Sequence, residues 1–166
     1  MTASEPLTLE EEFEMQQSWR EDDKKCTFIV LASAESDGKP GSSYVNENAL
    51  DRMAGDVNLF FNDYDDPHAC EIEVMIAEEK YRRKGFAKEV VKLMMAYATS
   101  KLNVTRFFCK INDTNDASLQ LFNTLGYVKC NYVGAFRQVE MELFPKDKRS
   151  EVVDTVLKSA VIHPAQ

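Results

Sequence analysis

The sequence is poor in the residue patterns that build metal sites and disulfide frameworks. It has only two histidines, His68 and His163, and we expect neither to share a metal site with another ligand. None of the four cysteines belongs to a C-x-x-C pair, which is a usual signature of structural zinc. We therefore expect no metal site, and we expect buried, reduced cysteines in a reducing compartment. The cysteines are Cys26, Cys70, Cys109 and Cys130.

Long apolar stretches and an excess of basic charge are also missing. No stretch approaches the length of a membrane span, and the first residues, MTASEPLTLEEEF, are too acidic and polar for a secretion signal. The formal net charge of -8 disfavours a nucleic-acid partner and suits a basic peptide or amine. These features predict a cytoplasmic protein without a membrane partner, with the nucleus as a second compartment.

The chain shows the patterns of strands and helices in a mixed order. Thr8-Leu9-Glu10-Glu11 has the form of a capping box, which predicts a helix from there to about Trp19. A charged segment with a weak helix at 152–160 follows the last strand. This order predicts an α/β or α+β fold, with one domain over residues 1–145 and a tail over 146–166. The expected strands are 26–33 (buried), 55–62, 71–77, 105–111 and a hairpin over 127–144, with a loop over 33–50 and a helix over 115–125.

The longest helix is predicted to open with the stretch YRRKGFA, residues 81–87. Its apolar residues form two stripes at helical spacing, so it is expected to lie against the sheet. One stripe contains Ala87, Val91, Met94, Ala98 and Leu102, and the other contains Phe86, Val90, Leu93 and Tyr97.

The basic residues of this stretch indicate an anion site. The first turn of a helix offers unpaired amide N–H groups and a positive dipole end, and Gly85 allows a ligand to approach the backbone closely. Cations in a first turn oppose the dipole at a cost of about 0.3–1 kcal/mol each, which favours a bound anion over a merely solvated surface. Neither the Walker A pattern nor G-x-G-x-x-G is present.

Two motifs resemble the GNAT acetyltransferases. Arg82-x-x-Gly85-x-Ala87 is similar to the [RQ]-x-x-G-x-[GA] motif that binds the pyrophosphate of acetyl-CoA in that family. The segment NDASLQLFNTLGY, residues 115–127, resembles the family's N-x-x-[AS]-…-L-G-F block. The resemblance covers residues 2 to about 145 and implies the GNAT acyl-CoA N-acyltransferase fold, a mixed central sheet flanked by helices.

The resemblance also implies acetyl-CoA as co-substrate and a set of residues that bind it. The pantetheine arm would pair with the backbone of Met75, Ile76 and Ala77 where the fourth strand of the family splays from the fifth, with a backbone N–H near Ile76 polarising the thioester carbonyl. Asn115 would contact the same arm, and Asn112 is a nearby alternative. The pyrophosphate would lie against Arg82, Arg83, Lys84, Gly85, Phe86 and Ala87.

The reaction implied by the family is direct attack of an amine on the acetyl thioester. The expected acceptor is a protein or peptide amine, either an N-terminus or a lysine, and a small metabolite is a weaker alternative. Strand alternation places Glu71, Glu73 and Met75 on one face. Glu73 is the first candidate for the base that removes the amine proton and Glu71 the second, against the plain alternative of a solvated acidic strand face.

The chain departs from the family pattern in two ways. Phe122 stands where many members carry a tyrosine that protonates the leaving thiolate, and Tyr127 and Tyr132 are more typical of packing residues. The family also begins with a strand and a helix before the helix expected at residue 9, so those elements are expected to be missing. That would expose strand 26–33 as a sheet edge, weaken stability and impair acceptor binding. An inactive interaction module that keeps the coenzyme scaffold is therefore the alternative function.

Overall fold

The fold is taken from a computed structural model, which describes residues 8–32 and 49–145. Most of the predicted loop over 33–50, the weak helix over 152–160 and the proposed tail over 146–166 lie outside the described residues. Within the described residues, no helix has the length and apolar character needed to cross a membrane.

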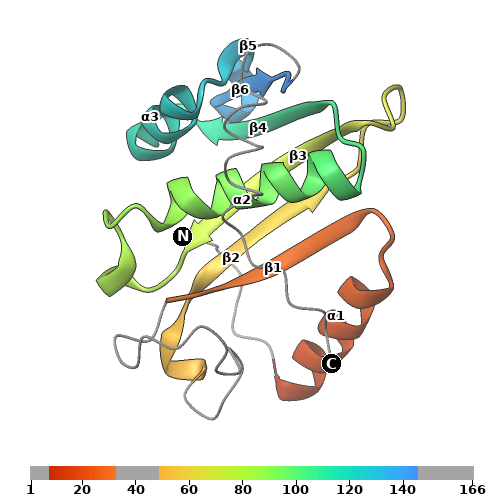
Figure 1. Ribbon diagram of the computed structural model, residues 1–166, viewed down its shortest axis with the longest axis vertical. Coiled ribbons are helices and arrows are strands. Elements are labelled where there is room, and N and C mark those ends of the chain that lie inside the picture. The colour runs from red at the N-terminus through yellow and green to blue at the C-terminus, as the bar shows by residue number, and fades with distance from the viewer. Residues whose placement is uncertain (1–7, 33–48, 146–166) are drawn as a thin grey trace.

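The described residues form a six-stranded mixed sheet with three α-helices (Figure 1). The strand order is β1-β2-β3-β4-β6-β5, in which β3 and β4 are parallel and every other neighbouring pair is antiparallel. The elements are α1 (Leu9–Glu21), β1 (Lys25–Leu31), β2 (Met53–Phe60), β3 (Ala69–Ile76), α2 (Phe86–Lys101), β4 (Arg106–Asn112), α3 (Asp116–Leu125), β5 (Val128–Val133) and β6 (Gln138–Leu143), with 3-10 turns at Leu50–Arg52, Glu79–Tyr81 and Gly134–Phe136.

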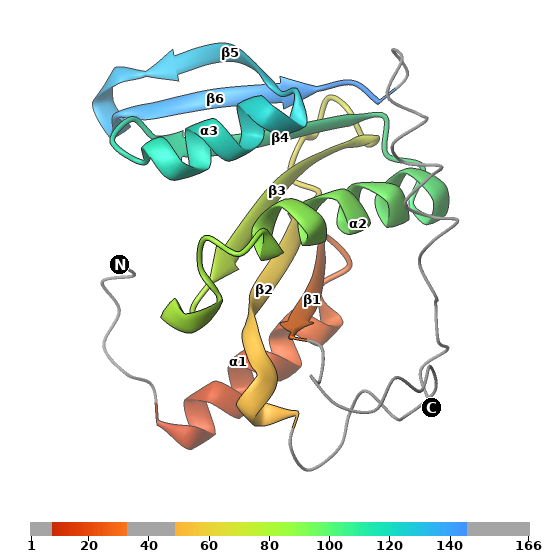
Figure 2. The ribbon, with the colours of Figure 1, turned by 60° about the vertical axis from the view of Figure 1, so that its left-hand side comes forward.

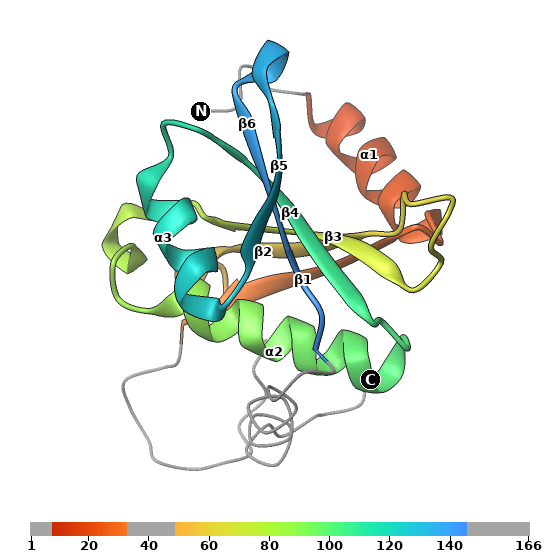
Figure 3. The same cartoon turned by 90° about the horizontal axis from the view of Figure 1, so that it is seen from above.

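The helices lie on both faces of the sheet (Figure 3). Helices α2 and α3 cover one face, and α1 lies on the opposite side. Strand alternation matches this division, because Val57 and Leu59 of β2 are buried under the helices while Asp56 and Asn58 face the other way. The core is therefore one-sided, and it contains Val57, Leu59, Cys70, Ile72, Val91, Met94, Met95, Ala98, Val104, Phe107, Cys109, Ile111, Phe122, Tyr127, Met141 and Leu143.

Helix α1 begins as predicted and packs less than predicted. The Thr8 hydroxyl accepts from the Glu11 amide at 3.3 Å and the Glu11 carboxylate accepts from the Thr8 amide at 2.8 Å, so the capping box is confirmed. The apolar residues of the helix are exposed, with Leu9 at 70%, Phe13 at 61% and Trp19 at 43%. Capping and first-turn acidic residues fix where the helix starts, and they do not require a buried face.

Strand β1 is not the buried strand that its apolar sequence predicts. It pairs with β2 and forms an outer edge of the described sheet. Phe28 and Ile29 are 43% and 53% exposed, although the Phe28 ring makes an edge-to-face contact with Tyr97 of α2 at a centroid distance of 5.2 Å. A continuous apolar run indicates a strand but does not reveal whether both of its faces are covered.

Helix α2 starts later and buries different residues than predicted. A 3-10 turn at Glu79–Tyr81 and Gly85 as N-cap precede it, so it begins at Phe86. Leu93 of the predicted stripe is 38% exposed. Met95, which is in neither predicted stripe, is buried, and its Sδ accepts from the hydroxyl of Tyr127 at 3.5 Å. The expectation that all cysteines are buried is also wrong for Cys130, which lies exposed on the outer strand β5.

Gly55 of β2 lies directly against the end of β3. A Cβ atom at this position would overlap the carbonyl group of Met75 and would lie 2.9 Å from Cα of Ile76. Its neighbours are backbone atoms, which cannot rotate aside as a flexible side chain could. The close packing of β2 on the last residues of β3 therefore requires glycine.

We predict that Gly55→Ala lowers the free energy of unfolding by about 1–3 kcal/mol, because the added methyl group must push two strands apart. Urea unfolding of the variant and of the wild type measures this difference. Gly134→Ala is the matched control, since its Cβ would meet only Cε1 of Tyr132 at 3.8 Å, and we expect a change within about 0.5 kcal/mol. Equal destabilisation by the two substitutions would contradict the steric argument.

Candidate active site

The two parallel strands of the sheet form a fork. Strand β3 pairs with β4 at three positions, the last of which joins Glu71 to Phe108. Beyond it, β3 runs on to Ile76 and β4 to Asn112 with no pairing between them. Figure 2 shows the two strands diverging from this point. The backbone edges that face each other across the fork can therefore hydrogen-bond to something inserted between them.

The predicted pantetheine contacts lie at the end of the β3 arm. Met75 and Ile76 are its last residues and Ala77 follows. The guanidinium of Arg82 donates to the carbonyl oxygens of Ile76, from Nε at 2.9 Å, and of Ala77, from Nη2 at 2.7 Å. Arg82 thus fixes the path of the chain between β3 and α2, a role that the sequence did not indicate.

The basic turn connects this arm to α2. The cations Arg82, Arg83 and Lys84 precede Gly85, so they do not occupy the first turn of the helix as predicted. Lys88 does, beside Glu89, so the cost of opposing the helix dipole applies to Lys88 alone among these cations. Left-handed backbone at Arg83 and Gly85, with φ of 61° and 91°, turns the chain sharply into the helix.

The start of α2 is open to a ligand. Gly85 is the N-cap and supplies no side-chain hydrogen bond to the first amides, including those of Phe86 and Ala87. Among the residues that the structure describes, no atom lies within 4 Å of where a Cβ atom at Gly85 would be, so there is space beside its backbone. Uncapped amides, a helix dipole and neighbouring cations fit a pyrophosphate group.

The two candidate asparagines lie on the β4 arm. Asn115 is the N-cap of α3, and its Oδ1 accepts from the Ser118 amide at 3.1 Å. Asn112 ends β4, and its Oδ1 accepts from the amide of Thr114 at 3.1 Å and from its hydroxyl at 2.6 Å. Both therefore shape the turn into α3, and both remain candidates for contact with the pantetheine arm.

The structure separates the two candidate bases. Glu71 is buried, with its side chain 10% exposed, and its Oε2 accepts from Nζ of Lys110 at 2.7 Å. Glu73 lies exposed on the same face of β3, beyond the last residue that pairs with β4. An exposed carboxylate can reach an incoming amine, whereas Glu71 is already engaged in an ion pair.

Glu73 also has the electrostatic environment of a base. Partial desolvation is the main cause that raises its pKa, followed by the negative charge of Glu71. Asp56 raises the pKa further, and Lys110 and Lys25 lower it. A carboxylate with a raised pKa accepts a proton more readily at neutral pH. Lys110 and Asp56 were not predicted as site residues, although alternation along β4 and β2 puts both on the face of Glu73.

Neither Tyr127 nor Tyr132 takes the place of the proton-donating tyrosine of the family, at whose position this chain has Phe122. Phe122 is buried and makes an edge-to-face contact with Tyr127 at 5.0 Å. Burial raises the pKa of Tyr127 well above its ordinary range, so this tyrosine is a packing residue as expected. Tyr132 donates to Oδ2 of Asp113 at 3.0 Å, which raises the pKa of its hydroxyl.

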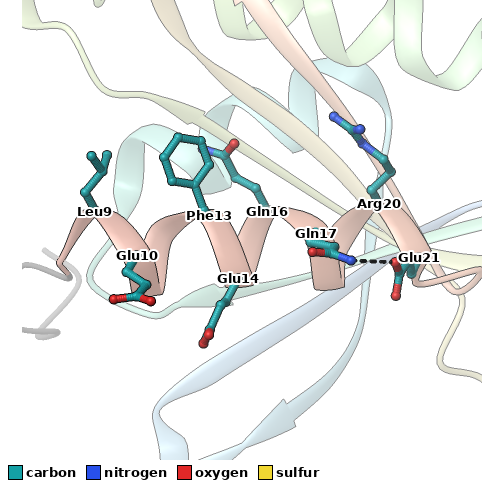
Figure 4. A pocket seen from close by; sticks show the side chains of 8 residues that line it. All are labelled: Leu9, Glu10, Phe13, Glu14, Gln16, Gln17, Arg20 and Glu21. Carbon is teal, nitrogen blue, oxygen red and sulfur yellow. Dashed lines mark hydrogen bonds between the residues drawn. The ribbon is translucent and has the colours of Figure 1, made fainter.

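A hollow of about 770 Å³ runs along α1, away from the basic turn. Figure 4 shows Leu9, Phe13, Gln16 and Arg20 extending from one side of the helix, while Glu10 and Glu14 extend from the other. The hollow is thus lined by apolar, amide and charged groups. Within residues 8–32 and 49–145, no group of three or more His, Cys, Asp or Glu residues could hold a metal ion.

Comparison with known proteins agrees with this geometry. Residues 2–128 match the acetyltransferase (GNAT) domain family. An N-acetyltransferase 9-like protein of Nematostella vectensis is 48% identical over 141 residues, which cover 85% of this chain and 68% of the relative. The alpha/beta-tubulin-N-acetyltransferase 9 of Homo sapiens is 43% identical over 143 residues, covering 86% and 67% respectively.

Solved structures show the same fold at low identity. The spermidine N-acetyltransferase of Vibrio cholerae, in complex with CoA and spermine, superposes with a TM-score of 0.65 at 18% identity, covering 90% of this chain and 81% of that chain. The chain belongs to the GNAT family of acetyltransferases, enzymes that act on amines.

Proposed function

We propose that this protein transfers the acetyl group of acetyl-CoA to an amine of a protein or peptide, and that Glu73 accepts the amine proton. The observation that carries the proposal is the fork between β3 and β4, which ends beside the basic turn at Gly85. One solved relative by fold is a complex with CoA, which supports acetyl-CoA as the co-substrate.

The chain's own residues have separate tasks in this reaction. The amides that begin α2, with Arg83 and Lys84, hold the pyrophosphate, and the arms of the fork hold the pantetheine. A backbone N–H near Ile76 donates to the thioester carbonyl oxygen, where negative charge develops. Arg82 keeps that part of the backbone in place through its two carbonyl contacts.

The transfer is a direct attack of the amine on the acetyl thioester. The amine nitrogen forms a bond to the carbonyl carbon of the thioester, and the bond from that carbon to sulfur breaks. Glu73 accepts the proton of the amine, directly or through a water molecule. Because Phe122 and Tyr127 are packed in the core, the leaving thiolate takes its proton from solvent.

A protein acceptor is supported by the names of the relatives and by acidic residues on the sheet face that carries Glu73. Three relatives above 40% identity are named for α- and β-tubulin, and we propose the N-terminus of tubulin as a substrate of this chain. The face of the sheet that carries Glu73 also carries Asp56 and Glu140, which suits a basic peptide. Acetyl transfer to tubulin N-terminal peptides, lysine peptides with blocked N-termini and spermidine tests this choice, and modification of spermidine alone would exclude it.

We predict that Gly85→Glu weakens CoA binding at least about tenfold, because it sets a carboxylate against the pyrophosphate. Isothermal titration with CoA measures the affinity. Gly85→Ala is the matched control for the backbone strain at φ 91°, and it should lower stability by roughly 1 kcal/mol while retaining most of the affinity. Gly134→Glu controls for the added charge. Wild-type affinity in Gly85→Glu would refute the pyrophosphate site, and tight binding without any acetyl transfer would favour the interaction module.

We predict that Glu73→Gln lowers kcat/KM for peptide acetylation by about 100- to 10,000-fold, the usual contribution of a general base. Glu71→Gln should retain most of the activity, since Glu71 is engaged with Lys110. Glu73 works only when ionised, and its pKa is raised, so wild-type kcat/KM should fall as the pH decreases through that raised value. Full turnover in both variants would show that neither carboxylate is the base.

A further inference from the structure

A lysine lies beside the two carboxylates at the fork. Glu71 is the last residue of β3 that pairs with β4, where its partner is Phe108. Lys110 lies two residues further along β4, on the same face as Phe108, and its ammonium reaches back to Glu71 at 2.7 Å. The ion pair therefore bridges the two strands where they begin to separate.

We propose that Lys110 is a positioning residue for acetyl transfer. Its ion pair with Glu71 engages that carboxylate, so that Glu73 is the carboxylate left free to take the amine proton. This inference rests on the proposed function of Glu73. It assigns to Lys110 a task that acts through its neighbours, without contact to the acetyl group.

The charges around Glu73 explain why such a residue is needed. The charges that act on Glu73 are those of Glu71 on its own strand, Lys110 of β4, Asp56 of β2 and Lys25 of β1. Glu140 of β6 lies opposite Lys110 in the sheet register, and α2 covers the other face of the sheet. Glu71 is the charge that acts most strongly on Glu73, and Lys110 is the next.

Removal of Lys110 alone would leave two carboxylates two residues apart, with Lys25 as the remaining cation that lowers the pKa of Glu73. Like charges at this distance disfavour ionisation, so the pKa of Glu73 would rise above its wild-type position and less of it would be available as a base at a given pH. Removal of Glu71 alone would have the opposite effect. With both present, Lys110 offsets part of the effect that Glu71 has on the pKa of Glu73.

A purely structural role for the ion pair makes a different prediction. Lys110 is 38% exposed and its partner Glu71 only 10%, so removal of Lys110 leaves a buried carboxylate without its partner and is expected to lower stability whatever else the pair does. If the pair only pinned β3 to β4, its loss would change the unfolding midpoint and leave the proton affinity of Glu73 unchanged. The two roles can therefore be separated by titration.

The test is a 13C NMR titration of the Glu73 carboxyl group in the full chain. We expect Lys110→Met to raise the pKa of Glu73 by about one pH unit, Lys110→Arg to keep it near the wild-type value and Glu71→Gln to lower it. The double variant Glu71→Gln/Lys110→Met should return it toward wild type, because both charges are removed together. Lys129→Met, the same charge change on β5, is the control and should leave it unchanged.

This readout needs no turnover, so it decides the role of Lys110 even if every acceptor peptide stays unmodified. An unchanged Glu73 pKa in Lys110→Met, with a lowered unfolding midpoint, would overturn the proposal. Should that variant fail to fold, Glu71→Gln and the double variant provide the same comparison.

The kinetic counterpart is the pH dependence of kcat/KM for a peptide acceptor. We expect the acidic limb of the profile to move upward in Lys110→Met by the same amount as the pKa of Glu73, so that kcat/KM falls about tenfold at low pH and recovers at high pH. Rescue by Lys110→Arg would support the charge effect. A shifted pKa with an unmoved pH profile would refute the role in acetyl transfer.

Discussion

The separation of β3 from β4 is the constraint on which the rest of the site depends. Paired backbone groups end at Glu71 and Phe108, and past that point each strand exposes hydrogen-bonding groups that need a partner. The protein meets part of this need itself, since Arg82 binds the carbonyl oxygens of Ile76 and Ala77. The remaining opening lies between the starts of α2 and α3, one at the end of each arm.

The cations and the acidic residues around the fork lie in different places. The cations of the turn before Gly85 lie at the end of the fork, beside uncapped helix amides. The acidic residues line the sheet face opposite α2, where desolvation and a neighbouring carboxylate raise the pKa of Glu73. An overall acidic chain thus keeps a local group of cations beside open helix amides, apart from its acidic sheet face.

Packing explains why Phe122 and helix α1 depart from common patterns. Phe122 and Tyr127 form a buried aromatic pair at the end of α3, so an ionisable group there would be desolvated and poorly suited to proton transfer. Helix α1 shows the converse, because its apolar residues extend from a helix held mainly by its own cap. The hollow is lined by residues of α1, and this helix lies on the side of the sheet opposite α2 and α3 (Figure 3).

Local rules of the chain were enough to determine the order of elements, the capping box at Thr8, the left-handed Gly126 that ends α3 and the glycine turn before α2. Each depends on residues within a few positions, so the sequence alone specifies it. Tertiary structure decided that β1 is an exposed edge, that Met95 faces the core and that Lys110 reaches Glu71 across 39 positions of chain. These outcomes depend on which elements pack against one another in the folded protein, and local sequence spacing does not specify that packing.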